Sequence, residues 1–462
     1  MEAGRDFYVD EGYICELLER GCGANDEQIC EILGRAERLA GLSHTDVAVL
    51  LGSAGEAHWR RIFEIAGDIK RMVYGDRVVV FAPLYVSDYC VNDCSYCGFR
   101  AVNKTGRRRL SMDELRDEVR ALEKMGHKRL ALETGEDPEN CPIDYVLECI
   151  REIYAMKFAG GEIRRVNVNI GATGEEDYRK LKSAGIGTLI LFQETYHRQT
   201  YEAVHLSGPK SDYAYHLTAF DRAMGAGLDD VGGGVLFGLY DHAFEVLGLM
   251  LHNEHLERRF GAGFHTISVP RIRKAEGNPE SFYQHAVSDE TFAQIVAIIR
   301  LAVPYTGIIL STREAPEVRK ALINAGVSQV SAGSRTSVGG YSAAQASSEQ
   351  FSIADRRDTA EVVCWLMDEG LVPSFCTACY RQGRTGDRFM ELAKAGEIRN
   401  VCLPNALFTL KEYALDYGNE SFAAKVDELV SNMLPKIMDE QTRAKAVENL
   451  QRLERGERDV FF

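Results

Sequence analysis

The stretch that decides the fold is Tyr85-Val-Ser-Asp-Tyr-Cys90-Val-Asn-Asp-Cys94-Ser-Tyr-Cys97-Gly-Phe99, which follows an apolar, strand-like run. It places three thiols in one short loop at CX3CX2C spacing. Three cysteine ligands leave one iron of a 4Fe-4S cluster free to bind a small molecule, and this spacing is typical of clusters that bind and reductively cleave S-adenosylmethionine (SAM). The pattern therefore predicts an open iron–sulfur site after a strand, with the aromatic Tyr96 as a candidate cofactor contact.

A structural zinc knuckle is the alternative interpretation of these thiols. Zinc would need a fourth nitrogen or sulfur ligand to close a tetrahedron. The loop contains no histidine and no fourth cysteine, so the sequence criteria for metal sites favour the cluster.

Length, charge and cysteine content narrow the class of protein. The 462 residues suggest two or three domains, or one barrel with additions. A net charge of −15 argues against a general nucleic-acid-binding surface. There is no apolar run of about 18 residues or more and no signal-like N-terminus, so we expect a cytoplasmic protein without membrane attachment. Twelve cysteines are too sparse for a disulfide scaffold, and clustered thiols in a reducing compartment more often hold metal.

Short β-branched runs alternate with helical stretches from Arg77 onward. Eight runs are strand candidates: Val78–Leu84, Arg129–Leu132, Val166–Ile170, Thr188–Phe192, Val231–Leu236, Thr266–Val269, Gly307–Leu310 and Gln329–Ser331. The intervals Ser111–Met125, Glu175–Ala184 and Asp289–Ala302 are long enough for the helical crossovers that parallel strands need. We therefore predict an α/β fold, a (β/α)8 TIM-type barrel, with a doubly wound open sheet as the alternative. In such a barrel the chemistry lies on the loops after the strands, and the cysteine triplet follows the first strand.

Two further regions flank the predicted barrel, which we assign to residues 76–345. Residues 1–75 form an N-terminal helical segment with apolar positions at helical spacing, and Ser43 with Asp46 fits the start of a helix. The Ser/Ala/Gln-rich stretch up to about Ser352 is interpreted as a linker. Residues 346–462 are predicted to form a mainly helical C-terminal domain that carries more cysteines.

Candidate cofactor contacts follow the second and fourth predicted strands. Gly135 and Glu136 could hold a cationic amino group, such as that of a methionyl moiety, although such a loop alone is more often a turn. Glu194, just past the fourth strand, could hold the amino or ribose groups of the cofactor. Three downstream residues are candidates for its carboxylate: Lys210, His216 and Arg222. Arg222 is slightly preferred, and each could instead be a solvated helix charge.

Arg313 and Ser331 lie at the ends of the last two predicted strands. A guanidinium there can form a bidentate clamp on a carboxylate, which suggests an amino-acid substrate. The alternative is a salt bridge at the barrel rim, for example with Glu314.

A second set of thiols lies in the C-terminal segment. Cys376-Thr-Ala-Cys379 is followed, after 22 intervening residues, by Cys402. This set again offers three ligands and an open iron, which could bind a small molecule or donate iron or sulfur. Zinc is a stronger competitor here, because CX2C pairs are common in zinc proteins. His265 opens the sixth strand, where a lone histidine is more often a core residue.

With both cysteine sets placed, the chain resembles the radical SAM tyrosine lyases of FeFe-hydrogenase maturation over nearly its whole length. The resemblance rests on Gly135-Glu-Asp-Pro138, Phe192-Gln-Glu-Thr-Tyr196, His265-Thr-Ile-Ser-Val-Pro-Arg271 and, above all, Phe375-Cys-Thr-Ala-Cys-Tyr-Arg-Gln-Gly-Arg-Thr-Gly-Asp-Arg-Phe389. The related tyrosine lyases of the thiamine pathway share the first cysteine set and lack the C-terminal pattern, so that pattern discriminates between them.

The resemblance implies a barrel with one 4Fe-4S cluster at each end of an internal cavity. At Cys90, Cys94 and Cys97, SAM would yield a radical that abstracts hydrogen from the amino group of L-tyrosine, giving p-cresol and dehydroglycine. The latter would become CO and cyanide on an extra iron at a second, auxiliary cluster, whose ligands would be Cys376, Cys379 and Cys402. Free L-cysteine would be a bridging ligand, and the product would be an iron–carbonyl–cyanide synthon.

The same resemblance assigns roles to other residues and names partners. His265 would bind the extra iron, while Arg313 and Ser331 would hold the substrate carboxylate. A reductant such as ferredoxin or flavodoxin would supply electrons, and other hydrogenase maturation proteins would be partners.

The chain departs from the family pattern at a few positions. Proline is expected at Leu206 and Phe264, alanine at Thr134, and a cysteine-bearing loop at Arg335 with glycine at Ser337. We expect Phe264 and Arg335 near the cavity. The cluster ligands are unchanged, which retains the predicted chemistry. Two other functions stay open: a related aromatic amino-acid lyase with a different product, and an iron–sulfur carrier that hands its cluster to another protein.

Overall fold

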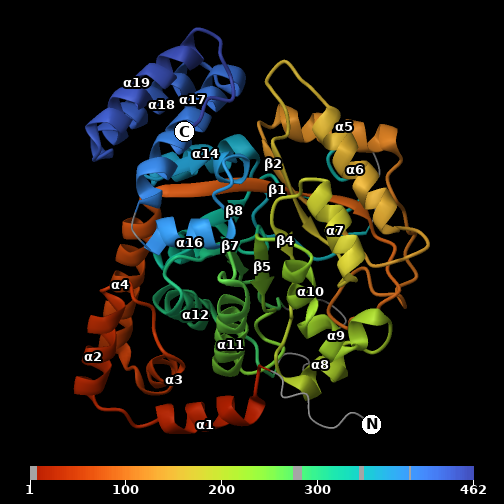
Figure 1. Cartoon of the computed structure of the whole chain (residues 1–462), viewed down its shortest axis with the longest axis vertical. Coiled ribbons are helices and arrows are strands. Elements are labelled where there is room, and N and C mark those ends of the chain that lie inside the picture. The colour runs from red at the N-terminus through yellow and green to blue at the C-terminus, as the bar shows by residue number, and fades with distance from the viewer. Residues whose placement is uncertain (1–7, 274–283, 343–347, 395–396) are drawn as a thin grey trace.

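A closed ring of parallel strands forms the centre of the computed structural model, which describes residues 8–273, 284–342, 348–394 and 397–462 (Figure 1). The ring strands are β1 (Arg77–Ser87), β2 (Arg129–Thr134), β3 (Arg165–Asn169), β4 (Leu189–Ile190), β5 (Val231–Gly234), β6 (Thr266–Ser268), β7 (Gly307–Leu310) and β8 (Gln329–Ser331). Neighbours pair in the order β2-β3-β4-β5-β6-β7-β8-β1, and β1 also pairs with β2, which closes the barrel. The predicted barrel is confirmed, with shifted strand ends, and the open sheet is wrong.

Helices surround the barrel because its apolar strands must be covered on their outer face. The crossover elements are α5 (Met112–Lys124), α6 (Ile143–Ala155), α7 (Glu175–Ser183), α8 (Arg198–Val204), η1 (Pro209–Ser211), α9 (Tyr213–Leu217), α10 (Ala219–Gly225), α11 (His242–Phe260), α12 (Asp289–Ala302) and α13 (Pro316–Asn324). Ser111 caps the N-terminus of α5, and its hydroxyl accepts a hydrogen bond from the backbone N–H of Glu114. This capping box fixes where the chain leaves the cysteine loop and turns back along the barrel.

The predicted N-terminal helical segment consists of α1 (Glu11–Gly21), α2 (Asp26–Ala36), α3 (His44–Ser53) and α4 (Glu56–Tyr74). Ser43 caps α3 together with Asp46, as the sequence predicts. Helix α4 packs against α12 and against α17 of the C-terminal segment, and it leads into β1. In Figure 1 the red helices α2 and α4 lie along the left side of the barrel, and α1 crosses the bottom of the view.

The C-terminal segment contributes a ninth strand to the barrel sheet. Its elements are α14 (Thr359–Asp368), β9 (Val372–Ser374), α15 (Ala378–Arg381), α16 (Gly386–Lys394), α17 (Ile398–Tyr417), α18 (Glu420–Met433), η3 (Leu434–Lys436) and α19 (Glu440–Glu454). Strand β9 pairs in parallel with the start of β1, from Arg77 opposite Val372 to Val79 opposite Ser374. The sequence does not predict this strand, which is only three residues long and contains Pro373.

The predicted linker turns out to contribute to the interior. Gln350 and Phe351 line a cavity at the carboxyl ends of the barrel strands, called the main cavity below. The predicted domain boundary at 345 falls within residues 343–347, which lie outside the described residues. Within the part of the chain that the structure describes, none of the helices combines the length and apolar character needed to cross a bilayer.

Candidate active site and second cysteine site

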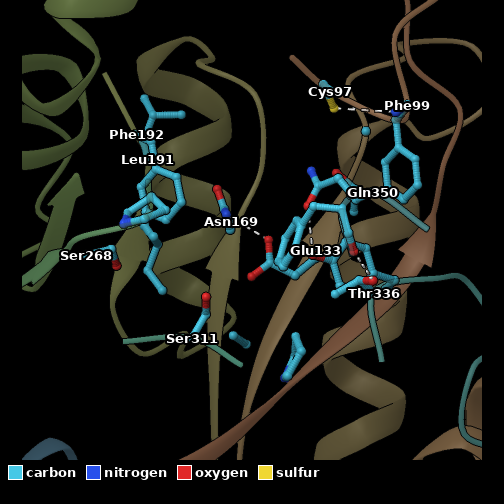
Figure 2. Close-up of a pocket in the computed structure, with 18 of the residues that line it drawn as sticks. Cys97, Phe99, Glu133, Asn169, Leu191, Phe192, Ser268, Ser311, Thr336 and Gln350 are labelled. Carbon is cyan, nitrogen blue, oxygen red and sulfur yellow. Dashed lines mark hydrogen bonds between the residues drawn. The ribbon is translucent and has the colours of Figure 1, made fainter. Parts of the chain in front are cut away.

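A cavity of about 220 Å³ opens at the carboxyl ends of the barrel strands. The predicted site residues that line it are Cys90, Cys94, Tyr96, Cys97, Gly135, Glu136, Glu194, Arg313 and Ser331. They come from the ends of different strands, so the barrel brings together residues that lie far apart in sequence. Figure 2 shows this cavity with Cys97 at one end and Ser268 and Ser311 across from Glu133.

The cysteine loop is held in shape by its own backbone. The N–H of Cys97 donates to the carbonyl of Cys94 at 3.0 Å, and the N–H of Phe99 donates to Cys97 Sγ at 3.4 Å (Figure 2). A side chain at Gly135 would collide with the carbonyl oxygen of Tyr89 and come within 3.0 Å of Cys90 Cβ. Gly135 is therefore required for the second strand's loop to approach the cysteines.

The thiols of this loop fit an iron–sulfur cluster. Burial raises the pKa of Cys94 to about 12 and that of Cys97 to about 11, so a metal must displace their protons on binding. A single zinc ion would need its ligands at about 2.3 Å, whereas a cluster spreads three thiolates over separate irons. The spacing therefore favours a cluster over zinc.

Tyr96 anchors the cysteine loop from inside. Its hydroxyl lies 2.8 Å from His205 Nε2, and His205 forms an isolated β-bridge with Cys94. Burial lowers the pKa of His205 to about 2, so this histidine is neutral and can accept the hydrogen bond from the tyrosine.

Glu194 lies in the cavity with a strained backbone and a cationic partner. Its φ of 69° is in the left-handed region, which is rare for residues other than glycine and is concentrated at functional sites. Lys210 Nζ donates to Glu194 Oε1 at 2.7 Å. Burial opposes the charge of Lys210, but the attraction of Glu194 outweighs it and the pKa of Lys210 is raised. The pair presents one buried carboxylate and one buried ammonium to a ligand.

The three candidates for the cofactor carboxylate are placed differently. Lys210 and His216 line the cavity, whereas Arg222 does not. The Arg222 guanidinium donates to the carbonyls of Thr173 and Tyr215 on the outer side of the barrel. The geometry therefore favours Lys210 over Arg222, contrary to the preference drawn from sequence.

Arg313 faces the cavity from the loop after β7. Its guanidinium lies 3.9 Å from the ring centroid of Phe351, Nη1 donates to the carbonyl of Arg271 at 3.3 Å, and Nε is buried without a hydrogen-bond partner in the described residues. Glu314, the alternative partner for Arg313, instead pairs with Arg271 at 2.7 Å. An unpartnered buried donor in a cavity is a natural contact for a ligand carboxylate. Ser331 accepts the backbone N–H of Thr312 at 3.1 Å nearby.

A row of polar side chains in the same cavity was not predicted. Asn169 donates to Glu133 at 2.7 Å, and Tyr85 donates to Gln350 at 2.7 Å (Figure 2). Burial raises the pKa of Glu133 to about 8, although the hydrogen bond from Asn169 acts in the opposite direction. The available signal was a carboxylate near the end of an otherwise apolar barrel strand, a position that is typical of catalytic residues.

The second cysteine set lies at the opposite end of the barrel. Cys376, Cys379 and Cys402 line a cavity of about 40 Å³ together with His265, which the resemblance assigns to the same site. Residues at the amino ends of the barrel strands complete it: Arg77, Val79, Arg129 and Gln329. The first cysteine set lies at the carboxyl ends of the parallel strands and the second at their amino ends, so the barrel interior separates them.

Buried donors surround the second cysteine set. Arg77 Nε, Arg129 Nε and Asn405 Nδ2 are buried and have no hydrogen-bond partner in the described residues. Burial opposes the charge of Arg77, but the three thiols outweigh it and its pKa is raised. The pKa of Cys379 is lowered, mainly by a hydrogen bond from the Cys402 thiol and further by the positive charge of Arg384. This donor set fits an anionic cluster bound by thiolates.

Two departures from the family pattern lie beside the cavities without lining them. Phe264 is fully buried and packs on Phe220 and His252, with ring centroids 5.2 and 5.0 Å apart. Arg335 donates to the carbonyl of Ser334. Neither residue lines the cavities that hold the cysteines, but each is next in sequence to residues that do: Arg335 lies between Ser334 and Thr336, and Phe264 precedes His265.

Comparisons with known proteins agree with this geometry. The Radical SAM superfamily matches residues 84–249, and the Biotin and Thiamin Synthesis associated domain matches residues 268–372. The chain is similar to 2-iminoacetate synthase of Escherichia coli strain K12, with 32% identity over 73% of this chain and 88% of that protein.

Solved structures extend the similarity to nearly the whole chain. A crystal structure of HydG, a maturase of the FeFe-hydrogenase, is 51% identical over 98% of this chain and 100% of that chain, with a TM-score of 0.96. HydG from Carboxydothermus hydrogenoformans is 37% identical over the same shares, with a TM-score of 0.83. Membership of the radical SAM superfamily implies a 4Fe-4S cluster and SAM. The chain therefore belongs to the HydG family of radical SAM maturases of FeFe-hydrogenase.

Proposed function

We propose that this protein is a tyrosine lyase, which cleaves L-tyrosine to p-cresol and dehydroglycine and converts the latter to CO and cyanide for assembly of the hydrogenase cofactor. The observation that carries the proposal is the placement of two three-cysteine sites at opposite ends of one barrel. The first adjoins the cavity that holds Arg313 and Ser331, where an amino acid can bind.

The first cavity would bind SAM and substrate side by side. When bound at Cys90, Cys94 and Cys97, a 4Fe-4S cluster supplies the electron that cleaves SAM. The Gly135-Glu136 loop would hold the SAM amino group, and Tyr96 keeps the cysteine loop in place. The Glu194–Lys210 pair would contact the polar groups of the cofactor.

Arg313 and Ser331 would hold the substrate carboxylate. Arg313 lines the cavity, and its guanidinium has the donor geometry that a carboxylate needs. The enclosed walls would keep water from the reacting radical.

The second cavity would process the fragment. When bound there, an auxiliary 4Fe-4S cluster with an extra iron supplies a Lewis-acidic centre for the fragment. Cys376, Cys379 and Cys402 would hold the cluster, while His265 and free L-cysteine would hold the extra iron. Arg77 and Arg129 would balance the negative charge. The product would be an iron–carbonyl–cyanide synthon, passed to other hydrogenase maturation proteins, and a ferredoxin or flavodoxin in the cytoplasm would supply electrons.

Anaerobic reconstitution tests the proposal. Two clusters and one extra iron correspond to about nine irons per chain. Tyrosine, SAM and a reductant should then yield p-cresol and 5′-deoxyadenosine. A fully reconstituted sample that forms no p-cresol would refute the proposal. Deoxyadenosine with a different aromatic product would identify a related lyase, and cluster transfer without SAM cleavage would identify a carrier.

A further inference from the structure

A buried carboxylate near the second cysteine site has no hydrogen-bond partner. Asp230 is 2% exposed, and neither of its carboxylate oxygens makes a hydrogen bond within the described residues. His265 Nδ1 is also buried without a partner, and it lies 3.6 Å from Asp230 Oδ2. Leaving such groups unpaired is costly, so a pair of them in near contact requires an explanation.

The backbone fixes these two residues side by side. Asp230 directly precedes β5 and His265 directly precedes β6, which are paired neighbours in the barrel. The N–H of His265 donates to the carbonyl of Val231 at 2.9 Å, and the carbonyl of Asp230 accepts the N–H of Leu189 at 3.0 Å. The pair therefore lies on the rigid amino-terminal rim of the barrel rather than on a mobile loop.

The imidazole is oriented by what surrounds it. Its ring packs on Phe389 with centroids 4.4 Å apart, and it lines the small cavity with the three cysteines. Since Nδ1 is the nitrogen that faces Asp230, Nε2 is the nitrogen left for a ligand. A small closing of the 3.6 Å separation would give a hydrogen bond from Nδ1–H to the carboxylate.

We propose that Asp230 is a positioning residue for His265, an inference that rests on the proposed function of the second site. The carboxylate accepts the Nδ1 proton, which fixes the tautomer whose Nε2 lone pair is free to bind the extra iron. Partners of this kind orient metal-binding histidines and raise their basicity.

A purely structural role would require another partner for Asp230. Arg165 feels the charge of Asp230, but its guanidinium lies 3.9 Å from the ring centroid of Tyr380, Nη1 donates to the carbonyl of Gly185, and its buried Nε makes no hydrogen bond to Asp230 in the described residues. Among the described residues, the ion pair found for Asp230 is that with His265.

The test compares Asp230→Asn with Asp229→Asn in fully reconstituted protein. Asp229 is adjacent in sequence and half-exposed, and it pairs with Lys182 at 3.2 Å. Each protein is challenged with an iron chelator, and iron per chain, p-cresol and melting temperature are measured. Asp230→Asn should bind the iron in excess of the two clusters with about 10- to 100-fold lower affinity than wild type. It should therefore lose that iron at a lower chelator concentration. Its p-cresol formation and melting temperature should be unchanged, and Asp229→Asn should behave as wild type.

A double-mutant cycle separates positioning from general destabilisation. Because Asp230 acts through the imidazole, Asp230→Asn should add nothing to His265→Ala. Retention of the extra iron by Asp230→Asn, or a joint fall in melting temperature and p-cresol, would overturn the inference. If wild-type protein forms p-cresol yet binds no iron beyond the clusters, the inference falls together with the second step of the proposed function. A wild type that forms no p-cresol while Asp230→Asn still loses the extra iron would instead refute only the lyase proposal.

Discussion

Lys210 Nζ contacts Glu194 Oε1 at 2.7 Å inside the main cavity, while the Glu194 backbone is held at a φ of 69°. This charge pair lies next to the cysteine loop and lines the same cavity. Removing one partner of a buried ion pair costs about 3–5 kcal/mol, because the other charge stays buried without compensation.

Lys210→Met should therefore weaken SAM binding at least about tenfold, which corresponds to about 1.4 kcal/mol. Equilibrium dialysis of SAM against reconstituted protein measures the effect. Lys182→Met is the matched control, because the Lys182–Asp229 pair is solvent-exposed and lies outside the cavity. Equal SAM affinity in Lys210→Met and wild type would remove Lys210 from the cofactor site.

Gly135→Ala should disturb the first cysteine loop without unfolding the barrel. The added methyl group would meet the Tyr89 carbonyl and Cys90 Cβ, so the loop has to move. Iron content should fall by about four per chain, the content of one cluster, and SAM cleavage should be lost. Gly174→Ala is the control, since nothing lies within 4 Å of its added Cβ. Normal iron content in Gly135→Ala would contradict the close approach.

The two cysteine sets should be separable by mutation. Cys90→Ala should abolish SAM cleavage, because it removes a ligand of the cluster that supplies the electron. Cys376→Ser or Cys379→Ser should leave p-cresol formation measurable while CO release falls sharply. His265→Ala should act in the same direction more mildly. Parallel p-cresol, CO, iron and zinc assays check this, and an equal loss of both products with zinc present in wild type would indicate a structural zinc site instead.

Arg313→Gln should raise the KM for tyrosine. A charged hydrogen bond contributes about 2 kcal/mol, so the net loss of one such bond predicts a rise of roughly 30-fold. Steady-state p-cresol formation at varied tyrosine concentration measures it. Arg222→Gln is a suitable comparison, because Arg222 does not line the cavity and should leave both tyrosine and SAM parameters nearly unchanged.

Glu133→Gln should alter how stability depends on pH. The folded-state pKa of Glu133 is about 8, above the ordinary value of 4.5, so the folded protein binds the extra proton between these values. Stability of the wild type should therefore fall as pH rises from about 5 to 8. Glu133→Gln should remove that slope and raise the free energy of unfolding at pH 9 by on the order of 2 kcal/mol relative to wild type. Each pKa unit is worth about 1.4 kcal/mol, and water in the cavity reduces the full effect. Denaturant titrations at pH 5, 7 and 9 decide it, and identical slopes in both proteins would show that Glu133 is charged when folded.

The barrel and the grouping of the cysteines could be predicted, because both follow from local sequence patterns. Runs such as Gly307–Leu310 keep their apolar character along the strand, and Cys90, Cys94 and Cys97 lie within one loop. Strand β4 is only two residues long, Leu189–Ile190, so predicted strand ends were less accurate than the strands themselves.

Features that depend on distant segments could not be read from the sequence. The contact between Gln350 and Tyr85 joins residues 265 positions apart, and the stretch that carries Gln350 has the composition of a linker. Lys210 lies in the short η1 turn and Arg222 in α10, both after the fourth strand, and only the fold decides which one lines the cavity. Asp230 and His265 meet because β5 and β6 are neighbours in the closed ring.

The pairing of β9 with β1 makes the C-terminal segment part of the barrel rather than a detachable module. Strand β1 spans about 33 Å at a rise of about 3.3 Å per residue, from Arg77 beside the second cysteine site to Ser87 beside the first. Its opening residues are hydrogen-bonded on one edge by Val372–Ser374. A chain cut before residue 372 would thus expose an unpaired strand edge, so in this protein the loss of the second site is expected to destabilise the barrel that carries the first.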